Sequence, residues 1–87
     1  TGVKNLRSSQ GNEIPNQFVI TTNEGKTLQS YQSIIAFVPN QGKTKLDNKF
    51  WDYSTTTGKY RNIFLGEDKK ATQKKIDSGE YELANLN

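Results

Sequence analysis

The chain of 87 residues has no cysteine, no histidine and no methionine, and it has two prolines. Without cysteine and histidine there is no disulfide, no zinc finger, no haem ligation and no thiol or Ser–His nucleophile. No apolar run approaches the roughly 18 residues of a membrane helix, and no secretory signal peptide is visible. The missing residue types therefore exclude most transition-metal sites and most nucleophilic enzymes.

Apolar residues are also scarce, because 31% of the chain is hydrophobic against about 45–50% in typical domains. Asn and Gln together number 15, and Ser and Thr another 15. Aromatic residues still make up 10% of the chain, which favours a folded domain, since disordered chains contain few of them. At this length one modest core is possible, and we expect no deep, enclosed catalytic cavity.

The formal net charge is +3, but it is distributed unevenly. Residues 43–75 carry nine basic and four acidic side chains, whereas the last twelve residues carry three acidic side chains and no basic one. A basic middle region suits an anionic partner, although dedicated DNA-binding domains usually have a denser basic stripe.

Hydrophobic alternation and β-branched residues predict a small antiparallel sheet. The expected strands cover residues 17–22, 27–38, 43–46 and 80–84. The second of these has apolar residues on both faces, so it should be the central strand, with a bulge near Gln32 and Ser33.

Two helices are expected between the third and the last strand. Ser54 as N-cap and Gly66 just after the last turn predict a helix over 55–65, and a second helix follows over 67–77. The order β-β-β-α-α-β favours an α+β fold, with both helices on one face of the sheet.

The first sixteen residues are polar and lack periodicity. We therefore expect residues 1–16 to form a flexible N-terminal arm and residues 17–87 to form a single α+β domain. The predicted core consists of Phe18, Ile20, Tyr31, Ile35, Phe37, Tyr60, Phe64 and Leu83.

Several motifs that resemble functional sites have simpler explanations. Gly-Lys-Thr occurs at 25–27 and 42–44, but the phosphate-binding loop needs a further glycine where this chain has Ile20 and Phe37, so we interpret both as turns. The acidic residues are scattered, and we expect no catalytic residues, no metal and no cofactor. The lysines of the second helix point in several directions around it, which is typical of a solvated helix.

The strongest functional signal is the aromatic–basic segment, residues 50–62. It combines aromatic, hydroxyl and cationic side chains, as interfaces and single-stranded nucleic-acid sites do. The candidate binding residues are Lys43, Lys45, Trp51, Tyr53, Thr55, Thr56, Lys59 and Arg61. We expect Tyr53, Lys59 and Arg61 to be exposed, whereas Phe50, Tyr60 and Phe64 are better explained as core.

If nucleic acid is the partner, the cations neutralise phosphates, while Tyr53 or Trp51 stacks on a base. Thr55 and Thr56 lie at the start of the first helix, where free backbone N–H groups favour an anion.

Four stretches carry a resemblance: GNEIPNQF at 11–18, QSYQSIIA at 29–36, WDYSTTTGKYRN at 51–62 and FLG at 64–66. They resemble small uncharacterised proteins encoded by phages of Gram-positive bacteria. This resemblance implies a context and no specific activity or site residues. It suggests a protein that acts in the cytoplasm of a bacterial host.

The sequence therefore predicts a small, non-catalytic binding protein and leaves two partner classes open. The first is DNA or RNA, bound through the basic residues of 43–75. The second is an acidic host protein involved in replication, transcription or defence, which this chain would inhibit. The local basic excess favours nucleic acid, and we expect neither a membrane nor a small-molecule substrate.

Overall fold

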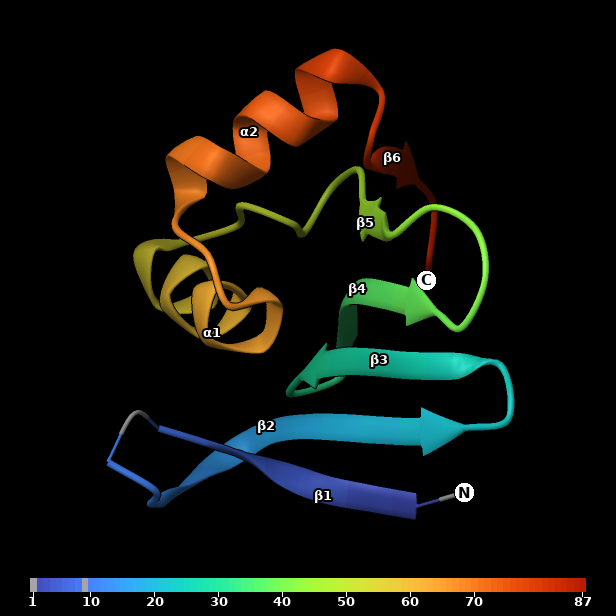
Figure 1. Ribbon diagram of the computed structural model, residues 1–87. Coiled ribbons are helices and arrows are strands. Elements are labelled where there is room, and N and C mark those ends of the chain that lie inside the picture. The colour runs from blue at the N-terminus through green and yellow to red at the C-terminus, as the bar shows by residue number, and fades with distance from the viewer. Residues whose placement is uncertain (1, 9) are drawn as a thin grey trace.

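The computed structural model describes residues 2–8 and 10–87, which form an α+β fold with a six-stranded mixed sheet and two helices (Figure 1). The elements in chain order are β1 (Gly2–Arg7), β2 (Glu13–Thr22), β3 (Gly25–Ser30), β4 (Ser33–Pro39), β5 (Lys45–Asp47), α1 (Thr55–Leu65), α2 (Lys69–Ser78) and β6 (Glu82–Ala84). The strands lie side by side in this same order across the sheet.

Strand β1 lies within the stretch that the sequence predicted to be a loose arm. It pairs antiparallel with β2, with Val3 opposite Ile20 and Asn5 opposite Phe18. The side chain of Leu6 is buried in the core. This edge strand was missed because its order comes from pairing with β2, and its own residues show no apolar alternation.

The predicted strand over 27–38 is two strands, β3 and β4, joined by a tight turn at Tyr31 and Gln32. Tyr31 adopts a left-handed backbone conformation with φ of 55°, which reverses the chain, and its N–H donates to the carbonyl of Asn16 at 2.7 Å. A bulge separates the pairs Leu28–Ala36 and Gln29–Ile34. The irregularity expected near Gln32 is therefore a complete hairpin turn.

Both helices begin and end close to the predicted positions. Ser54 caps α1 by accepting a hydrogen bond from the Thr57 N–H at 3.1 Å, and Gly66 follows the helix with φ of 73°. Asp68 caps α2 by accepting from the Ala71 N–H at 2.8 Å. These caps satisfy backbone groups that the helix ends leave free, which explains why local sequence sufficed to predict them.

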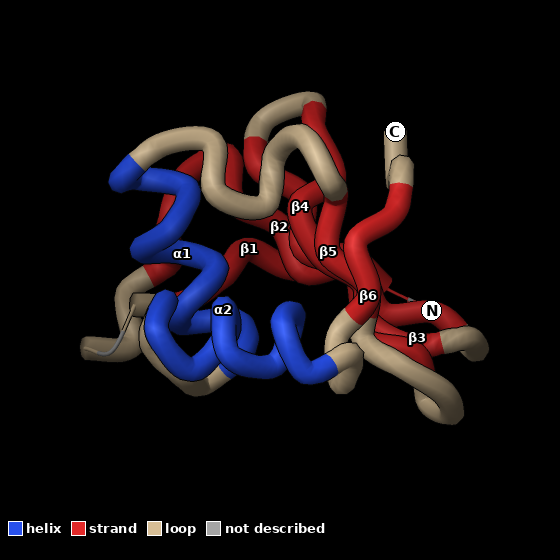
Figure 2. The backbone as a smooth tube through the Cα atoms, turned by 90° about the horizontal axis from the view of Figure 1, so that it is seen from above, coloured by secondary structure: helices blue, strands red, loops and turns tan. Residues whose placement is uncertain are grey.

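The closing strand β6 pairs parallel with β5, so the sheet is mixed and not purely antiparallel. The chain leaves β5, forms both helices and returns beside β5 in the same direction. The two helices supply the long crossover that parallel neighbours require. Helix α1 packs against β1 and β3, whereas α2 extends from the end of α1 toward β6 (Figures 1 and 2). The expected placement of both helices on one sheet face is therefore met only in part.

The core differs from the predicted one. The buried apolar residues are Leu6, Ile14, Leu28, Ile35, Ala36 and Leu46. Of the predicted core, Ile35 is fully buried, and Tyr60 and Phe64 are half-buried against this cluster. Tyr31 and Leu83 are instead exposed, at 62% and 42%.

Strand register explains the difference. Val19, Leu28 and Ala36 lie opposite one another and share one sheet face, where Leu28 and Ala36 are fully buried. Because side chains alternate along a strand, Phe18, Ile20 and Phe37 lie on the other face, where they are half-buried. Both faces of these strands are apolar, so alternation alone does not indicate which face the helices cover.

No helix in the described part of the chain is long and apolar enough to cross a membrane.

Candidate binding site around the start of helix α1

A buried carboxylate fixes the loop that leads from β5 into α1. Asp47 is 1% exposed, and its Oδ2 accepts hydrogen bonds from the N–H groups of Lys49 at 3.0 Å and Phe50 at 2.8 Å. Its Oδ1 accepts from the Leu86 N–H at 2.9 Å. Burial alone would raise the pKa of Asp47, but these backbone donors outweigh it and hold the pKa below its ordinary value.

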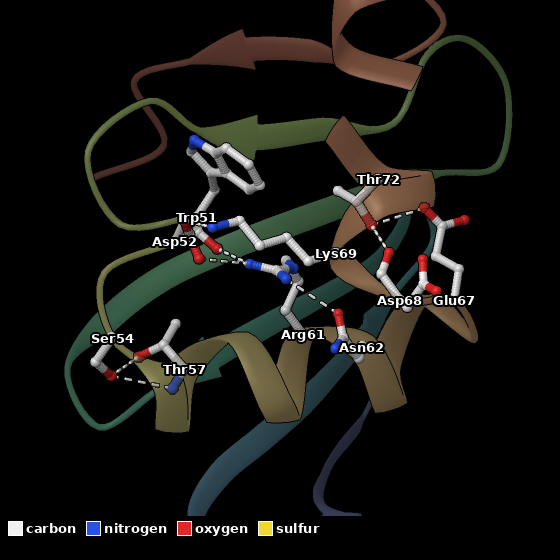
Figure 3. A network of polar contacts seen from close by, with 10 residues as sticks. All are labelled: Trp51, Asp52, Ser54, Thr57, Arg61, Asn62, Glu67, Asp68, Lys69 and Thr72. Carbon is white, nitrogen blue, oxygen red and sulfur yellow. Dashed lines mark hydrogen bonds and ion pairs between the residues drawn. The ribbon is translucent and has the colours of Figure 1, made fainter. Parts of the chain in front are cut away.

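Arg61 lies buried at the centre of a polar network, together with Trp51, Asp52, Asn62 and Lys69 (Figure 3). It is 0% exposed, and one guanidinium nitrogen donates to the Trp51 carbonyl at 2.7 Å while the other donates to Asn62 Oδ1 at 3.0 Å. The guanidinium also lies 5.2 Å from the centroid of the Trp51 ring. We call these five residues the Arg61 network.

The expectation that Arg61 is exposed is therefore wrong, because its side chain is fully buried. The residue lies on the side of α1 that faces the loop carrying Trp51 and Asp52. A Cβ at Gly58 would lie 3.5 Å from the guanidinium nitrogen. The half-buried Trp51 stacks on Arg61 and packs against the core, so its ring is not free to stack on a base.

Asp52 supplies the negative charge of this network. Its two carboxylate oxygens lie 3.4 Å from Arg61 and 2.7 Å from the Lys69 ammonium. Partial burial by itself would raise the pKa of Asp52, but Lys69 and Arg61 outweigh that effect and lower it. The network therefore joins the start of α2 to α1 and to the loop before it (Figure 3).

A groove of about 370 Å³ lies on the other side of the α1 N-terminus. Its aromatic lining residues are Tyr31, Phe50 and Tyr53, and Ile35 also lines it. The remaining lining residues all carry hydroxyl groups: Ser30, Ser33, Ser54, Thr56 and Thr57. We call this the aromatic groove, and within the described residues no charged side chain lines it.

The two tyrosines of the aromatic groove present their rings to solvent. Tyr53 is 69% exposed and Tyr31 is 62% exposed, the two most exposed aromatic residues in the described chain. The Phe50 and Tyr53 rings lie 5.5 Å apart between centroids with an interplanar angle of 57°. Tyr31 additionally occupies a left-handed conformation that is rare for a bulky residue, and such strain is frequent at functional sites.

A second, wider cleft of about 750 Å³ begins where the aromatic groove ends, and Ser54 lines both. Its charged lining residues are Asp52, Lys59, Arg61 and Lys69, and the other residues are Ser54, Thr55, Gly58, Asn62 and Ile63. Three of its side chains are cationic and one is anionic. We call this the cationic cleft.

Residues 1–80 match a protein family described as a family of unknown function, DUF8033. The chain belongs to this family. Neither a curated protein nor a solved structure matches it. The description of this family names no activity.

The sequence-predicted site residues are divided among these surfaces. Tyr53 and Thr56 line the aromatic groove, while Thr55 and Lys59 line the cationic cleft. All four are exposed, as predicted for Tyr53 and Lys59.

The remaining predicted residues are less well suited to binding. Trp51 and Arg61 belong to the Arg61 network, and Lys45 is half-buried and lies 3.9 Å from the carboxylate of Glu82. Lys43 is exposed in the loop before β5 and lines neither the groove nor the cleft.

Sequence reasoning missed two residues of the site, Tyr31 and Lys69. Tyr31 was assigned to the core, although the polar pair Gln32 and Ser33 beside it is a signal for a turn. Lys69 was grouped with the solvated lysines of the second helix, whereas it forms an ion pair with Asp52 in the loop before α1. Lys70 and Lys74 are exposed, as expected for a solvated helix face.

A separate polar cluster ties α2 to the segment before β6. Glu67 accepts from the Lys75 ammonium at 2.6 Å, the Tyr81 hydroxyl at 3.0 Å and the Thr72 hydroxyl at 2.8 Å. Burial alone would raise the pKa of Glu67, but its three partners lower it. Within residues 2–8 and 10–87, no three acidic side chains come close enough to hold a metal ion together.

Proposed function

We propose that this protein binds single-stranded nucleic acid, with bases stacking on Tyr53 and Tyr31 in the aromatic groove. The observation that carries the proposal is an exposed, uncharged aromatic surface that adjoins a cationic one at Ser54. Proteins that bind single strands combine these two features, because bases stack on aromatic rings while cations neutralise the backbone.

The shape of the groove supports a single strand in preference to a duplex. Its hydroxyl-rich walls and aromatic rings suit unpaired bases, which present both a ring face and hydrogen-bonding edges. In a duplex the bases are stacked on one another, so the rings of Tyr31 and Tyr53 would have no base face to contact. Of the two helices in the described residues, α1 holds one arginine and α2 holds none, so neither is suited to arginine contacts in a major groove.

Two lysines lie near the aromatic groove, one over the Phe50 ring and one in the adjoining cleft. The ammonium of Lys49 lies 5.6 Å from the centroid of the Phe50 ring, and Lys59 lines the adjoining cleft. Neither lysine forms an ion pair with another described residue, so their charges remain available for phosphates. Arg61 contributes no direct contact in this proposal, because it is fully buried.

The test is a titration with labelled oligonucleotides of about 12 nucleotides, single- and double-stranded, as DNA and as RNA. We expect single strands to bind more tightly than duplexes at about 50 mM salt and to weaken at about 200 mM, with a logarithmic slope near −0.7 per phosphate contact. Tyr53→Phe, which keeps a stacking ring, serves as the matched control for Tyr53→Ala.

No binding of any strand at about 50 mM salt would contradict the proposal. Binding of an acidic protein through the same tyrosines would then become the better hypothesis, since exposed tyrosines are also frequent anchors of protein interfaces.

A further inference from the structure

We propose that the cationic cleft binds a terminal phosphate monoester, so that the protein prefers single strands with a phosphorylated end. This inference rests on the proposed function, because it assigns the end of the strand that the aromatic groove holds. It concerns a surface that lies outside the groove and that, unlike the groove, is lined by charged residues.

The charge of the cleft matches a dianion. Lys59, Lys69 and Arg61 contribute three positive charges and Asp52 contributes one negative charge, which leaves a formal excess of two. A phosphodiester inside a strand carries a single negative charge, whereas a terminal monoester carries close to two at neutral pH. The second charge therefore gives the monoester an electrostatic advantage in this cleft.

The Arg61 network leaves hydrogen-bond donors in the cleft uncommitted. Asn62 uses its Oδ1 to accept from Arg61, so its side-chain NH₂ remains a donor, and the hydroxyl of Thr55 is exposed at the start of α1. A monoester has three terminal oxygens, and it satisfies more of these donors than a diester does.

Asp52 pairs with two of the three cations of the cleft. Its carboxylate holds Lys69 at 2.7 Å and Arg61 at 3.4 Å, while Lys59 has no such partner in the described chain. An incoming phosphate therefore contacts Lys59 directly and shares Lys69 with Asp52. Both lysines should contribute to the preference for a phosphorylated end.

The position of the cleft suits a strand end. Ser54 lines both surfaces, so a phosphate in the cleft is adjacent to the groove where Tyr53 would stack on the terminal base. Either end of a strand can carry a monoester, and the two ends are separate arms of the experiment.

The experiment measures the dissociation constants of single strands that differ only in a terminal phosphate or hydroxyl, once at the 5′ end and once at the 3′ end. We expect the phosphorylated form to bind about tenfold more tightly at one of the two ends. The ratio of the two constants is the readout, because general attraction between lysines and the strand cancels in it.

Three variants test the assignment to the cleft. Lys59→Gln and Lys69→Gln should bring the ratio close to one while hydroxyl-ended strands still bind. Lys49→Gln is the matched control, since Lys49 lies over the Phe50 ring and does not line the cleft, and it should weaken both strands equally. Equal binding of phosphate- and hydroxyl-ended strands by the unmodified protein would overturn this inference alone, whereas no binding of any strand would overturn the proposed function as well.

Discussion

The Arg61 network and the aromatic groove both take residues from the same thirteen-residue segment, 50–62, but they differ in burial and in charge. In the network, Trp51 covers a fully buried guanidinium whose charge is balanced by Asp52. In the groove, Tyr53 is 69% exposed and no charged side chain of the described chain is present. One side of the α1 N-terminus therefore holds a buried guanidinium, and the other side exposes aromatic rings to solvent.

This difference shows that a mixture of aromatic and basic residues does not by itself identify a binding surface. An arginine beside a tryptophan is equally suited to stack within a fold and to stack on a ligand. Burial separates the two cases, and burial depends on which residues of the loop fold over the helix. The variants below test whether the two regions can be separated in solution.

The largest expected effect is that of Arg61→Ala on stability. Removing a fully buried guanidinium leaves the Trp51 carbonyl without this donor, leaves Asp52 with Lys69 alone, and leaves a cavity beside the tryptophan ring. We expect the free energy of unfolding to fall by about 3–5 kcal/mol, measured by urea denaturation. Lys59→Ala, at an exposed position two residues earlier, should change it by less than about 0.5 kcal/mol.

Equal stability of these two variants would mean that the network does not support the fold. Retained stability of Arg61→Ala with reduced strand binding would restore the original expectation that Arg61 contacts phosphate.

The next effect is a loss of stability in acid. The pKa values of Asp47, Asp52 and Glu67 are lowered in the folded protein, so the unfolded chain binds more protons in the acid range. Their stabilising contribution is fully present above their ordinary pKa values near 4 and is lost as the pH falls through the lower folded values. Urea midpoints should therefore decrease from pH 6 to pH 3, and Asp47→Asn should flatten this dependence. A pH-independent midpoint would contradict the geometry of these carboxylates.

A substitution in the aromatic groove should lower the affinity for single strands and leave the stability unchanged, in contrast to a substitution in the Arg61 network. Tyr53→Ala removes an exposed ring, so its unfolding free energy should remain within about 0.5 kcal/mol of the unmodified protein. Its affinity for single strands should fall by roughly 1–3 kcal/mol, with little change in salt dependence, because stacking is lost and no cation is removed. Tyr53→Phe should retain most of the affinity. A destabilised Tyr53→Ala variant would mean that the two regions are not separable.

The smallest expected effect is a gain in stability for Gly58→Ala. The added Cβ lies 3.5 Å from the Arg61 guanidinium, which is ordinary van der Waals contact, and the backbone of α1 at this position is helical. Alanine in a helix interior is favoured over glycine by about 0.5–1 kcal/mol. A thermal melt should therefore shift upward, and a downward shift would show that Arg61 packs more tightly against Gly58 than this distance indicates.

Features encoded by a few neighbouring residues were predictable from sequence. The bounds of α1 follow from Ser54 and Gly66, and the end of α2 follows from Gly79, because capping residues act on the turn beside them. The exposure of Tyr53 and Lys59 also followed from local polarity.

Features that depend on distant partners were not predictable in this way. Strand β1 is ordered by its pairing with β2, and the direction of β6 is set by its pairing with β5 after the chain has formed both helices. Arg61 is buried by the loop around Trp51. The turn at Tyr31 requires a left-handed backbone conformation, which a tyrosine rarely adopts, so the sequence did not indicate it. In each case the local pattern was compatible with the wrong answer, and tertiary contacts decided it.

Backbone amide NMR directly tests the proposal that the groove side of the α1 N-terminus is the binding surface. A short single-stranded oligonucleotide is added to the isotope-labelled protein, and the resonances that shift are mapped onto the fold. We predict that the shifts concentrate at Tyr31, Phe50, Tyr53 and Thr56, which line the aromatic groove. Shifts centred on Phe18, Ile20 and Phe37, or no shifts at all, would contradict the claim.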